Sequence, residues 1–464
     1  MNYKTSIVWL RRDIRLEDNR ALFEACCHSE TVIPVFVFDT NILDKLKNKN
    51  DRRVYFIYQT LLELNQFLLS HGKSLLIIYG NPIEELPKLA KNYNAQCVFT
   101  NKDYEPKTIE RDQKVSKVLS EIGIHFKLFK DQVIFEENEI LKTNKTPYVV
   151  FTPYKNEWLK CFSHITLKTY SYQISKFINK DKIKNINFHW NINCIHFNST
   201  NLLINPGRTY ALHLLEKFAN KINNYDSSRD YFAANGTSML SMHLRFGTLS
   251  IREAFIFANK YPSKGADIWK SELIWREFYK MILSQFPHVE KKCFKSEYEH
   301  LKWENNADYF ECWKSGLTGF PVVDAAMRCF QQTGWMHNRL RMIVASFLTK
   351  DLLVDYRKGE SYFAEHLLDF DMSANNGGWQ WSASTGCDAQ PFFRVFNPEA
   401  QSLKFDPTGQ FIKTYCPELS HCDAKQIHAP HKYFTGLFSA NLNYPKPIVQ
   451  HDKQRMKAMQ MFKK

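Results

Sequence analysis

Short hydrophobic runs alternate with amphipathic patterns over the first 135 residues. The short runs are rich in β-branched and aromatic residues and predict strands at Ser6–Leu10, Val32–Asp39, Ser74–Gly80, Gln96–Asn101 and His125–Asp131. The patterns between them have helical spacing and predict helices at Arg20–His28, Arg52–His71, Pro82–Asn92 and Lys107–Ile122. Strands that alternate with helices form parallel, doubly wound sheets, so we expect an N-terminal α/β domain over residues 1–135.

The pattern changes beyond this expected α/β domain. Between residues 136 and 205 the alternation stops, and Lys168–Asn201 is rich in Lys, Asn and Ile without a clear period, which favours an inter-domain linker. After Pro206 every long hydrophobic pattern has helical spacing. We therefore expect an α/β domain, a linker over residues 136–205, and an all-helical domain over residues 206–464.

Charge and aromatic content narrow the classes of partner. The chain has 464 residues and a formal net charge of +14, so a polyanion such as nucleic acid is a candidate partner. Chains rich in Lys and Asn are also basic for reasons of composition alone. Aromatic residues make up 15% of the chain and include 10 tryptophans, which indicates stacking surfaces or unusually bulky cores.

The cysteine and histidine patterns argue against disulfides and metals. The 11 cysteines are odd in number and include no CxxC pair, so we expect reduced thiols. His428 and His431 have HxxH spacing, but they flank Pro430 and no carboxylate or cysteine set lies nearby. We expect no metal site there.

Targeting signals are also missing from the sequence. The apolar run Ser6–Leu10 is followed directly by Arg11 and Arg12, unlike a signal peptide. No apolar run approaches the about 20 residues that a membrane span needs. We expect a soluble cytoplasmic protein that has no membrane partner.

The loop after the first predicted strand, RRDIRLEDN, occupies the place where a dinucleotide-binding GxGxxG would stand. That fingerprint is missing. The basic residues of the loop either hold an anion or cap the sheet.

The stretch DFDMSANNGGWQWSASTG, from Asp369 to Gly386, has an unusual composition. Acids, amides, two glycines and two tryptophans stand together, and the Gly377-Gly378 pair lets the backbone approach another group closely. This mixture suits a pocket for a large, flat, polar molecule. The alternative is a glycine turn between two helices whose tryptophans fill the core.

The segment SELIWREFYKMILSQF predicts a helix with two different faces. One face is polar and aromatic, with Glu272, Trp275, Arg276 and Tyr279, and the opposite face is apolar, with Ile274, Phe278, Met281 and Ile282. The first face either stacks on bases and hydrogen-bonds to them, or is a surface Glu–Arg pair beside exposed aromatics.

Two further segments carry candidate binding groups. GWMHNRLRMIVASFLTKDLL places Asn338, Arg341 and Met342 on one helical face with Arg339 beside it, and a buried Arg341 needs a carboxylate partner. The run from Asn235 to Ser238 reads as a turn and N-cap before a helix over Met239–Phe246, whose start would suit a phosphate. No nucleophile–base triad or P-loop is recognisable.

These segments, in order, resemble the DNA photolyase and cryptochrome flavoproteins. The motifs that carry the resemblance are GTSMLS, SELIWREFY, TGFPVVDAAMR, GWMHNRLRM and DFDMSANNGGWQWSASTG. The resemblance extends from IVWLRRDIRLEDN to YPKPIVQH and is greatest to class I bacterial cyclobutane pyrimidine dimer photolyases. It implies an N-terminal antenna domain, and a helical domain that binds FAD in a folded conformation.

The resemblance also implies a set of cofactor-binding residues. They are Tyr225, Thr237, Ser238, Met239, Leu240, Ser241, Arg341, Asp369, Phe370, Asp371 and Asn375. Arg341 would pair with Asp369 beside the isoalloxazine, and Asn375 would face flavin N5. An uncharged amide there accepts from N5–H and favours reduced flavin, whereas many cryptochromes carry Asp or Cys.

The lesion-side residues implied by the family are Glu272, Trp275, Arg276, Asn338, Arg339, Met342 and Trp381. The two indoles would stack on a dimer flipped out of duplex DNA, and the two arginines suit phosphates. Glu272 and Asn338 would hydrogen-bond the thymine edges, and a protonated Glu272 would stabilise the developing anion radical. Relatives that act on (6–4) photoproducts have two histidines at the positions of Asn338 and Met342, so the expected substrate is the cyclobutane dimer.

The implied activity is a photo-lyase reaction in which excited reduced FAD lends an electron to the dimer. A blue-light receptor of cryptochrome type is the alternative. Relatives usually carry three tryptophans that photoreduce oxidised flavin. Here Trp379 and Trp303 match the near and far members, but Tyr356 stands in the middle, so we expect slower or rerouted photoreduction.

The antenna chromophore is left open by the resemblance. Relatives that use folate match an Asn-Glu pair where this chain has Lys107-Thr108, although Lys291 matches a further folate contact. Folate, a deazaflavin, another flavin or no antenna remain alternatives. The expected partner is double-stranded DNA that contains a pyrimidine dimer, bound by a monomer in the bacterial cytosol or nucleoid.

Overall fold

The computed structural model describes residues 3–183, 191–434 and 443–463. These residues form two compact units, each of which is described by itself. The first unit comprises Met1–Tyr148, Pro153–Asn223 and Ser238–Gln285, and the second comprises Val149–Thr152, Asn224–Thr237 and Phe286–Lys464. Residues 184–190 of the expected linker lie outside the described residues.

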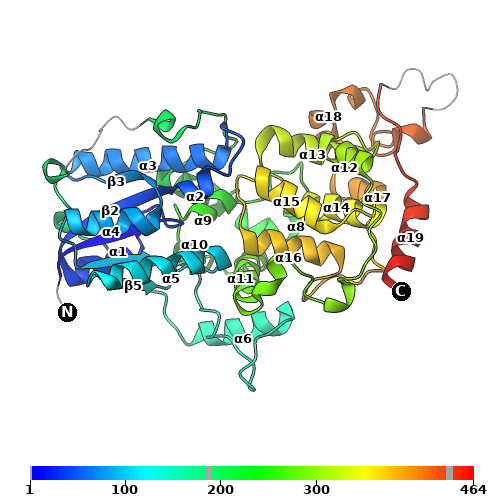
Figure 1. Cartoon of the computed structure of the whole chain (residues 1–464). Helices are drawn as coiled ribbons and strands as arrows, with labels where there is room; N and C mark the ends of the chain where they lie inside the picture. Colours follow the sequence, from blue (N-terminus) through cyan, green and yellow to red (C-terminus); the bar gives the residue numbers. More distant parts are fainter. Residues whose placement is uncertain (1–2, 184–190, 435–442, 464) are drawn as a thin grey trace. The chain divides into compact units, whose positions relative to one another are not determined.

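A parallel sheet forms the centre of the first unit (Figure 1). Its strands are β1 (Tyr3–Leu10), β2 (Ser29–Asp39), β3 (Leu76–Gly80), β4 (Cys97–Asn101) and β5 (His125–Phe129). In the described residues their order is β3-β2-β1-β4-β5, and every neighbouring pair is parallel. The predicted doubly wound sheet is therefore confirmed, with its topological switch point between β1 and β4.

Helices cover both faces of the sheet. They are α1 (Arg20–His28), α2 (Thr40–Leu43), α3 (Arg52–Ser70), α4 (Pro82–Asn92) and α5 (Pro106–Glu121). Side chains alternate along β1, so that Val8 packs into a core with α1 and α3, while Ile7 packs into a second core with α4 and α5. This alternation of buried side chains on both faces produces the continuous hydrophobic runs seen in the sequence.

The first unit also contains helices from later in the chain. They are α6 (Phe151–Ser163, from Pro153 onward), α7 (Arg208–Ala219), α9 (Ser241–Phe246), α10 (Ile251–Ala258) and α11 (Lys264–Gln285). Helix α6 lies in the stretch where we expected regular structure to stop. Its Trp158 is fully buried, stacks on Phe162 and Phe255, and donates a hydrogen bond to Glu277. Tertiary packing therefore holds a helix that has a weak sequence pattern.

The second unit is built from helices, in agreement with the expected helical half. They are α8 (Tyr225–Ser228), α12 (Ala307–Ser315), α13 (Pro321–Thr333), α14 (Asn338–Ser346), α15 (Tyr356–His366), α16 (Met372–Ala383), α17 (Pro398–Phe405), α18 (Gln410–Tyr415) and α19 (His451–Lys463). A π-helical turn, Phe347–Asp351, continues α14. The core of the unit is apolar and includes Trp313, Phe330 and Trp379.

Short 3-10 turns connect several of these elements. They are Ile174–Lys176, Lys180–Lys182, Ile192–Ile195, Ile222–Asn224, Pro287–Glu290, Ser296–Tyr298, Pro417–Leu419 and Pro430–Lys432. All 11 cysteines are free thiols, as expected.

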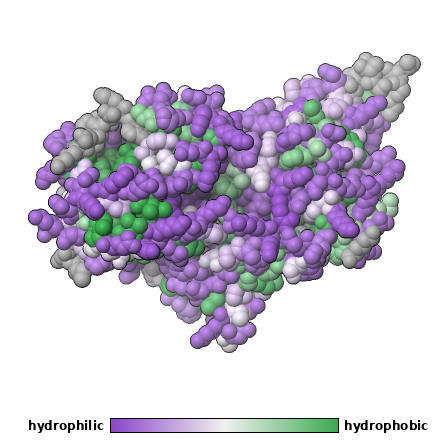
Figure 2. All heavy atoms as spheres, in the orientation of Figure 1, coloured by the Kyte–Doolittle hydropathy of each residue, from purple (hydrophilic) through white to green (hydrophobic). Residues whose placement is uncertain are grey.

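The exposed side chains on the face shown in Figure 2 are mostly hydrophilic, with smaller hydrophobic areas between them. Of the helices in the described part of the chain, none combines the length and hydrophobicity of a membrane span.

Candidate flavin and DNA site

Helix α16 contains most of the unusual stretch from Asp369 to Gly386. Asp371 is its N-cap and accepts a hydrogen bond from the Ala374 amide at 3.2 Å. The helix runs through Gly377 and Gly378 without a break, so the alternative of a glycine turn between two helices is wrong. Hydrogen bonds from Asn376 and Gln380 to the Val289 carbonyl hold the helix in place despite its two glycines.

One face of α16 leaves space for a ligand. Apart from the adjoining residues and backbone of the helix itself, no heavy atom of the described residues lies within 4 Å of the position that a Cβ on Gly378 would occupy. A glycine inside a helix costs about 1 kcal/mol relative to alanine, so the position is poor for stability alone. Asn375 stands one turn earlier on the same face and is half-buried. This face therefore has room for the close approach of a flat group.

The amide of Asn375 is oriented by its neighbour on α15. Its Nδ2 donates a hydrogen bond to the Glu360 carbonyl at 3.1 Å. Because the amide nitrogen is used in this way, Oδ1 is the atom that can accept from a bound group. No hydrogen bond to this oxygen occurs among the residues that the structure describes.

The predicted pair of Arg341 and Asp369 is present. Nη2 of Arg341 donates to both carboxylate oxygens of Asp369, at 3.0 and 2.8 Å, and Nε donates to the Met336 carbonyl at 2.7 Å. Asp369 is buried, while the Arg341 side chain is 29% exposed. The arrangement presents a cation at the surface of the unit with its carboxylate held behind it. Phe370, the next residue, is half-buried against the core.

Helix α14 brings together the lesion-side residues of the second unit. Asn338 is exposed, and its Nδ2 lies 3.8 Å from Sδ of Met342, one turn later. His337 caps the helix, since its Nδ1 accepts from the Arg339 amide at 3.1 Å. Burial lowers the pKa of His337 to about 4, so the ring is neutral and can accept this bond.

Arg339 is already engaged within the second unit. Its Nη2 forms an ion pair with Asp230 at 2.9 Å, and its guanidinium lies 4.5 Å from the centre of the Phe405 ring. A phosphate would therefore share this cation with Asp230. Trp381 is half-buried, and in the described part of its own unit no aromatic ring packs against it.

In the first unit, α11 shows the two faces that its pattern predicts. Glu272, Trp275 and Arg276 are partly exposed, whereas Ile274 and Phe278 are buried. The Trp275 ring is held from one side by Tyr279, with ring centroids 5.3 Å apart. Nη1 of Arg276 donates to the Gln132 carbonyl at 2.6 Å and Nη2 donates to the Leu244 carbonyl at 3.5 Å, which fixes the guanidinium.

The segment around Ser238 differs from the expected helix start. Helix α9 begins at Ser241 and has six residues, whereas the sequence pattern predicted Met239. The reason is local: Met239 has a φ of +56°, which a right-handed helix does not allow. Thr237, Ser238, Met239 and Leu240 therefore form an irregular segment, of which Leu240 is buried. The helix start expected at Met239 is therefore wrong, and α9 begins two residues later.

Tyr225 begins the short helix α8 in the second unit and is buried. The guanidinium of Arg229 lies 5.4 Å from the centre of its ring.

The basic loop RRDIRLEDN after β1 binds the chain's own carboxylates. Arg11 pairs with Asp112 at 2.6 Å, and Arg12 pairs with Glu105 at 2.6 Å. Of the two alternatives for this loop, capping of the sheet describes the structure.

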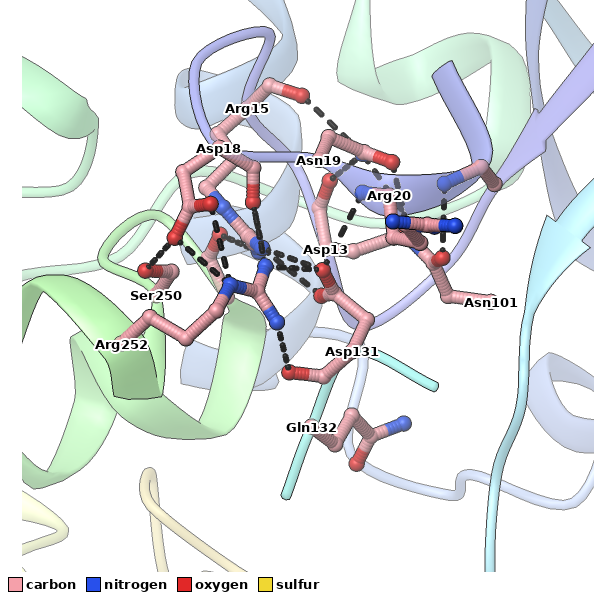
Figure 3. Close-up of polar contacts among 12 residues, drawn as sticks. Asp13, Arg15, Asp18, Asn19, Arg20, Asn101, Asp131, Gln132, Ser250 and Arg252 are labelled. Carbon is pink, nitrogen blue, oxygen red and sulfur yellow. Dashed lines mark hydrogen bonds and ion pairs between the residues drawn. The ribbon is translucent and has the colours of Figure 1, made fainter. Parts of the chain in front are cut away.

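Arg15 extends this loop into a buried network (Figure 3). It donates to Asp131 at 2.8 and 2.7 Å, and Arg252 of α10 donates to both Asp18 and Asp131. Burial alone raises the pKa of the Asp131 carboxyl, but Arg15 and Arg252 outweigh it and lower the pKa to about 2. The network ties α10 to the loops after β1 and β5, all within the first unit.

Two of the three residues linked to an antenna lie at exposed positions. Lys107 is exposed in the first turn of α5, Thr108 is half-buried, and Lys291 is exposed in the second unit.

The two histidines with HxxH spacing form separate hydrogen bonds. His428 bonds to Ser402 Oγ at 2.6 Å, and His431 bonds to the Pro445 carbonyl at 2.7 Å. Within residues 3–183, 191–434 and 443–463, no group of three or more His, Cys, Asp or Glu could hold a metal ion.

Three residues near the site were not predicted from the sequence. Glu360 and His337 orient Asn375 and the start of α14, respectively, and Trp313 packs against Trp379. Each acts through a contact between segments, or through a buried hydrogen bond, that the local sequence does not predict. The residues that the motifs did identify carry recognisable combinations of charge and aromatic rings.

Comparisons with known proteins show which family the chain resembles. The FAD binding domain of DNA photolyase matches residues 269–464, and the DNA photolyase domain matches residues 6–171. The chain is 36% identical over 467 residues to a deoxyribodipyrimidine photo-lyase of Synechococcus sp., covering 96% of this chain and 94% of that protein.

Solved structures agree as well. The chain is similar to a bacterial class III photolyase from Agrobacterium tumefaciens, with a TM-score of 0.90, 30% identity and coverage of 100% and 98%. It is also similar to an archaeal photolyase from Sulfolobus tokodaii with two FAD molecules, with a TM-score of 0.86, 35% identity and coverage of 99% of both chains. The open face at Gly378, the oriented amide of Asn375 and the Arg341 cation suit the flavin of such a domain. The chain belongs to the DNA photolyase family and carries its FAD-binding domain.

Proposed function

We propose that this protein repairs cyclobutane pyrimidine dimers in DNA with light, using bound FAD. When bound and reduced, the flavin supplies one electron to the dimer on illumination and receives it back after the cyclobutane ring has split. The protein residues hold flavin and lesion in a fixed, water-poor geometry, which is the main contribution that a protein makes to such a reaction. The relative from Synechococcus sp. is named a deoxyribodipyrimidine photo-lyase, which is the name of this activity.

The second unit carries most of the residues that are proposed to hold the flavin. Arg341 places a cation beside the isoalloxazine, and Asp369 keeps its guanidinium in position. Asp371 caps α16 and so fixes the helix that carries Asn375. Tyr225, Thr237, Phe370 and the segment Ser238–Ser241 complete the proposed cofactor-binding set.

The orientation of Asn375 is the observation that carries the proposal of repair. Because Nδ2 donates to the Glu360 carbonyl, Oδ1 is available to accept a hydrogen bond from N5–H of reduced flavin. A carboxylate at this position would meet the Glu360 carbonyl as a second acceptor and lose that bond. The amide therefore favours reduced flavin, the form that photorepair requires. This supports repair over the receptor alternative.

Lesion recognition is proposed to use aromatic, hydrogen-bonding and apolar side chains. Trp275 and Trp381 have partly exposed indoles that can stack on the bases of a flipped dimer. Glu272 and Asn338 can hydrogen-bond the thymine edges, and Met342 supplies apolar contact. Asn338 and Met342 also favour the cyclobutane dimer over the (6–4) product as substrate.

DNA binding is proposed to be electrostatic outside the lesion pocket. The net charge of +14 attracts a duplex, and Arg276 and Arg339 lie beside the lesion-side residues of their own units. We propose that the protein acts as a monomer in the cytosol or nucleoid.

Repair of two defined lesions tests the proposal. Purified holoprotein is reduced chemically and mixed with a duplex that contains either a cyclobutane thymine dimer or a (6–4) product, with dark controls for both. Loss of the cyclobutane lesion alone, and only in light, is the expected result. Binding of FAD without repair of either lesion would favour the receptor alternative.

A further inference from the structure

A second buried indole lies against Trp379 in the core of the second unit. The ring centroids of Trp313 and Trp379 are 6.1 Å apart, at an interplanar angle of 70°. This separation is within the about 4.5–7 Å over which aromatic side chains contact each other. Trp313 is fully buried, and its Nε1 donates to the Val344 carbonyl at 3.1 Å, which fixes the ring. Trp379 therefore has an immediate neighbour with the same oxidisable side chain.

The tyrosine at the middle position of the family's electron chain is less well placed. Among the residues that the structure describes, no ring contact links Tyr356 to Trp379 or to Trp303. The Trp379 ring instead approaches Gly359, one turn later on α15, where a Cβ would stand 2.2 Å from the indole. Trp303 packs on Phe462 of α19, with ring centroids 6.3 Å apart.

The surroundings of Tyr356 also oppose its oxidation. A phenol loses its proton when it is oxidised, and a buried phenol needs a base to take that proton. Tyr356 is 1% exposed, and its hydroxyl donates to Cys293 Sγ at 3.8 Å, a thiol that is a poor base. The Arg357 guanidinium lies 4.9 Å from the centre of its ring, so a further positive charge there is repelled.

Trp313 has a path towards solvent on its other side. Its ring centroid is 5.8 Å from that of Tyr362, which is half-buried and packs at 4.3 Å on the exposed ring of His366. The Tyr362 phenol is hydrogen-bonded to the side chain of Gln331, an exposed residue, so the phenol lies at the edge of the core, and loss of its proton on oxidation leaves a neutral radical. A neutral radical is not repelled by Lys314, whose ammonium lies 5.9 Å from the Tyr362 ring and pairs with Glu311 at 2.7 Å.

We infer that photoreduction of the flavin in this protein proceeds from Trp379 through Trp313 to Tyr362. Trp379 gives one electron to the excited oxidised flavin and takes one from Trp313. Trp313 takes one electron from Tyr362, whose O–H bond breaks as the proton passes to water. A soluble thiol then returns one electron and one proton to Tyr362. The inference rests on the proposed function and on the family resemblance, by which Trp379 matches the member of the electron chain that is nearest the flavin.

Flash photolysis of the oxidised holoprotein tests this route in deoxygenated buffer with excess thiol. The variants are Trp313→Phe, Tyr362→Phe and Tyr356→Phe, and Trp269→Phe of α11 is the matched control for a buried indole. Wild type is expected to show an indole radical and then a tyrosyl radical. Trp313→Phe is expected to lose the tyrosyl signal and steady-state photoreduction, whereas Tyr356→Phe and Trp269→Phe keep both.

Tyr362→Phe provides a second arm that does not disturb the core indoles. The tyrosyl signal should vanish and the indole radical should decay by charge recombination. A tyrosyl signal that survives in Tyr362→Phe and disappears in Tyr356→Phe would overturn the inference, as would wild-type photoreduction in Trp313→Phe. The Tyr362→Phe variant tests the electron route even if Trp313→Phe binds no flavin.

Failure of the proposed function gives a different result. Chemically reduced Tyr362→Phe should repair the cyclobutane lesion as wild type does, because the route serves only photoreduction. If reduced wild type repairs no lesion, the proposed function is wrong, while the radical signals still decide the route.

Discussion

Arg341 and Asp369 form a two-point contact in which one guanidinium nitrogen donates to both carboxylate oxygens, at 3.0 and 2.8 Å. The Asp369 carboxylate is buried and the Arg341 guanidinium is partly exposed, so the carboxylate holds the guanidinium in position. This relationship places a fixed cation at the surface proposed to meet the isoalloxazine.

Substitution of Asp369 by Ala should therefore weaken FAD binding as well as folding. A hydrogen bond to a charged partner contributes about 1.5–3 kcal/mol to stability, so we expect the free energy of unfolding to fall by an amount in this range. Arg341 would also lose its orientation. Flavin occupancy after purification and urea denaturation measure the two effects, with Asp308→Ala, an exposed acid of α12, as control. Full occupancy in Asp369→Ala would contradict the proposed role.

Asn375→Asp should lower the reduction potential of the bound flavin. The variant loses the hydrogen bond from Nδ2 to the Glu360 carbonyl and brings a negative charge towards N5. Spectroelectrochemical titration of wild type, Asn375→Asp and Asn375→Ala separates the effect of charge from the loss of the acceptor. An unchanged potential in both variants would show that Asn375 does not face the reactive part of the flavin.

Arg339 and Asp230 should affect DNA affinity in opposite directions. The pair is held at 2.9 Å, so Asp230→Asn releases the Arg339 cation for a phosphate. We expect tighter binding and a steeper salt dependence in Asp230→Asn, and the reverse in Arg339→Ala, with a change in slope of about 0.9 per phosphate contact. Binding isotherms over a series of salt concentrations measure both. If neither variant changes the slope, Arg339 contacts no phosphate.

His337 should make the protein sensitive to mild acid. Burial lowers its pKa from 6.5 to about 4, so folding favours the neutral ring. The stability that depends on the neutral ring is complete above pH 6.5 and is lost as the pH falls towards 4. Protonation also removes the lone pair of Nδ1 that accepts from the Arg339 amide.

His337→Asn should flatten this pH dependence because Asn caps helices well and does not titrate. The expected difference between wild type and variant grows to about 3 kcal/mol or less at the acid end, from 1.36 kcal/mol per pKa unit. Urea denaturation across this pH range measures it. Parallel pH profiles for the two proteins would contradict the assignment.

Asp131 should be essential to the first unit. It is buried between Arg15 and Arg252, and removal of one partner from a buried ion pair costs about 3–5 kcal/mol. We expect Asp131→Asn to lose stability in this range, whereas Asp267→Asn, an exposed acid of α11 paired with Lys270, should change it little. Equilibrium unfolding of the two variants is the measurement. A small effect in Asp131→Asn would mean that the network relaxes around the loss.

The elements of the α/β sheet were predictable because buried strands and amphipathic helices leave a periodic pattern. Helices α1 and α4 have the predicted bounds, and β4 differs from its predicted range by one residue. Helix α6 and the unbroken α16 were not predictable in the same way. The contacts that hold them, Trp158 on Glu277 and Asn376 on Val289, join segments far apart in the sequence.

In the candidate site, too, the sequence predicts single residues better than the contacts between helices. Motifs identified Arg341, Asp369 and Asn375; the charge of Arg341 predicted a carboxylate partner, and the family resemblance implied that this partner is Asp369. The sequence does not show that Glu360 orients Asn375, nor that Trp313 lies against Trp379, since both contacts depend on how helices pack. It also suggested a phosphate role for Arg339 without its partner Asp230.

The most direct test of the account counts the dimers repaired by each flavin without an external electron source. Reduced holoprotein, freed from reductant and oxygen, is illuminated with an excess of duplex that contains a cyclobutane dimer. If the electron returns after each ring opening, many dimers are repaired per flavin and the flavin stays reduced. Repair that stops at one dimer or fewer per flavin, with the flavin oxidised, would contradict the proposed photo-lyase reaction.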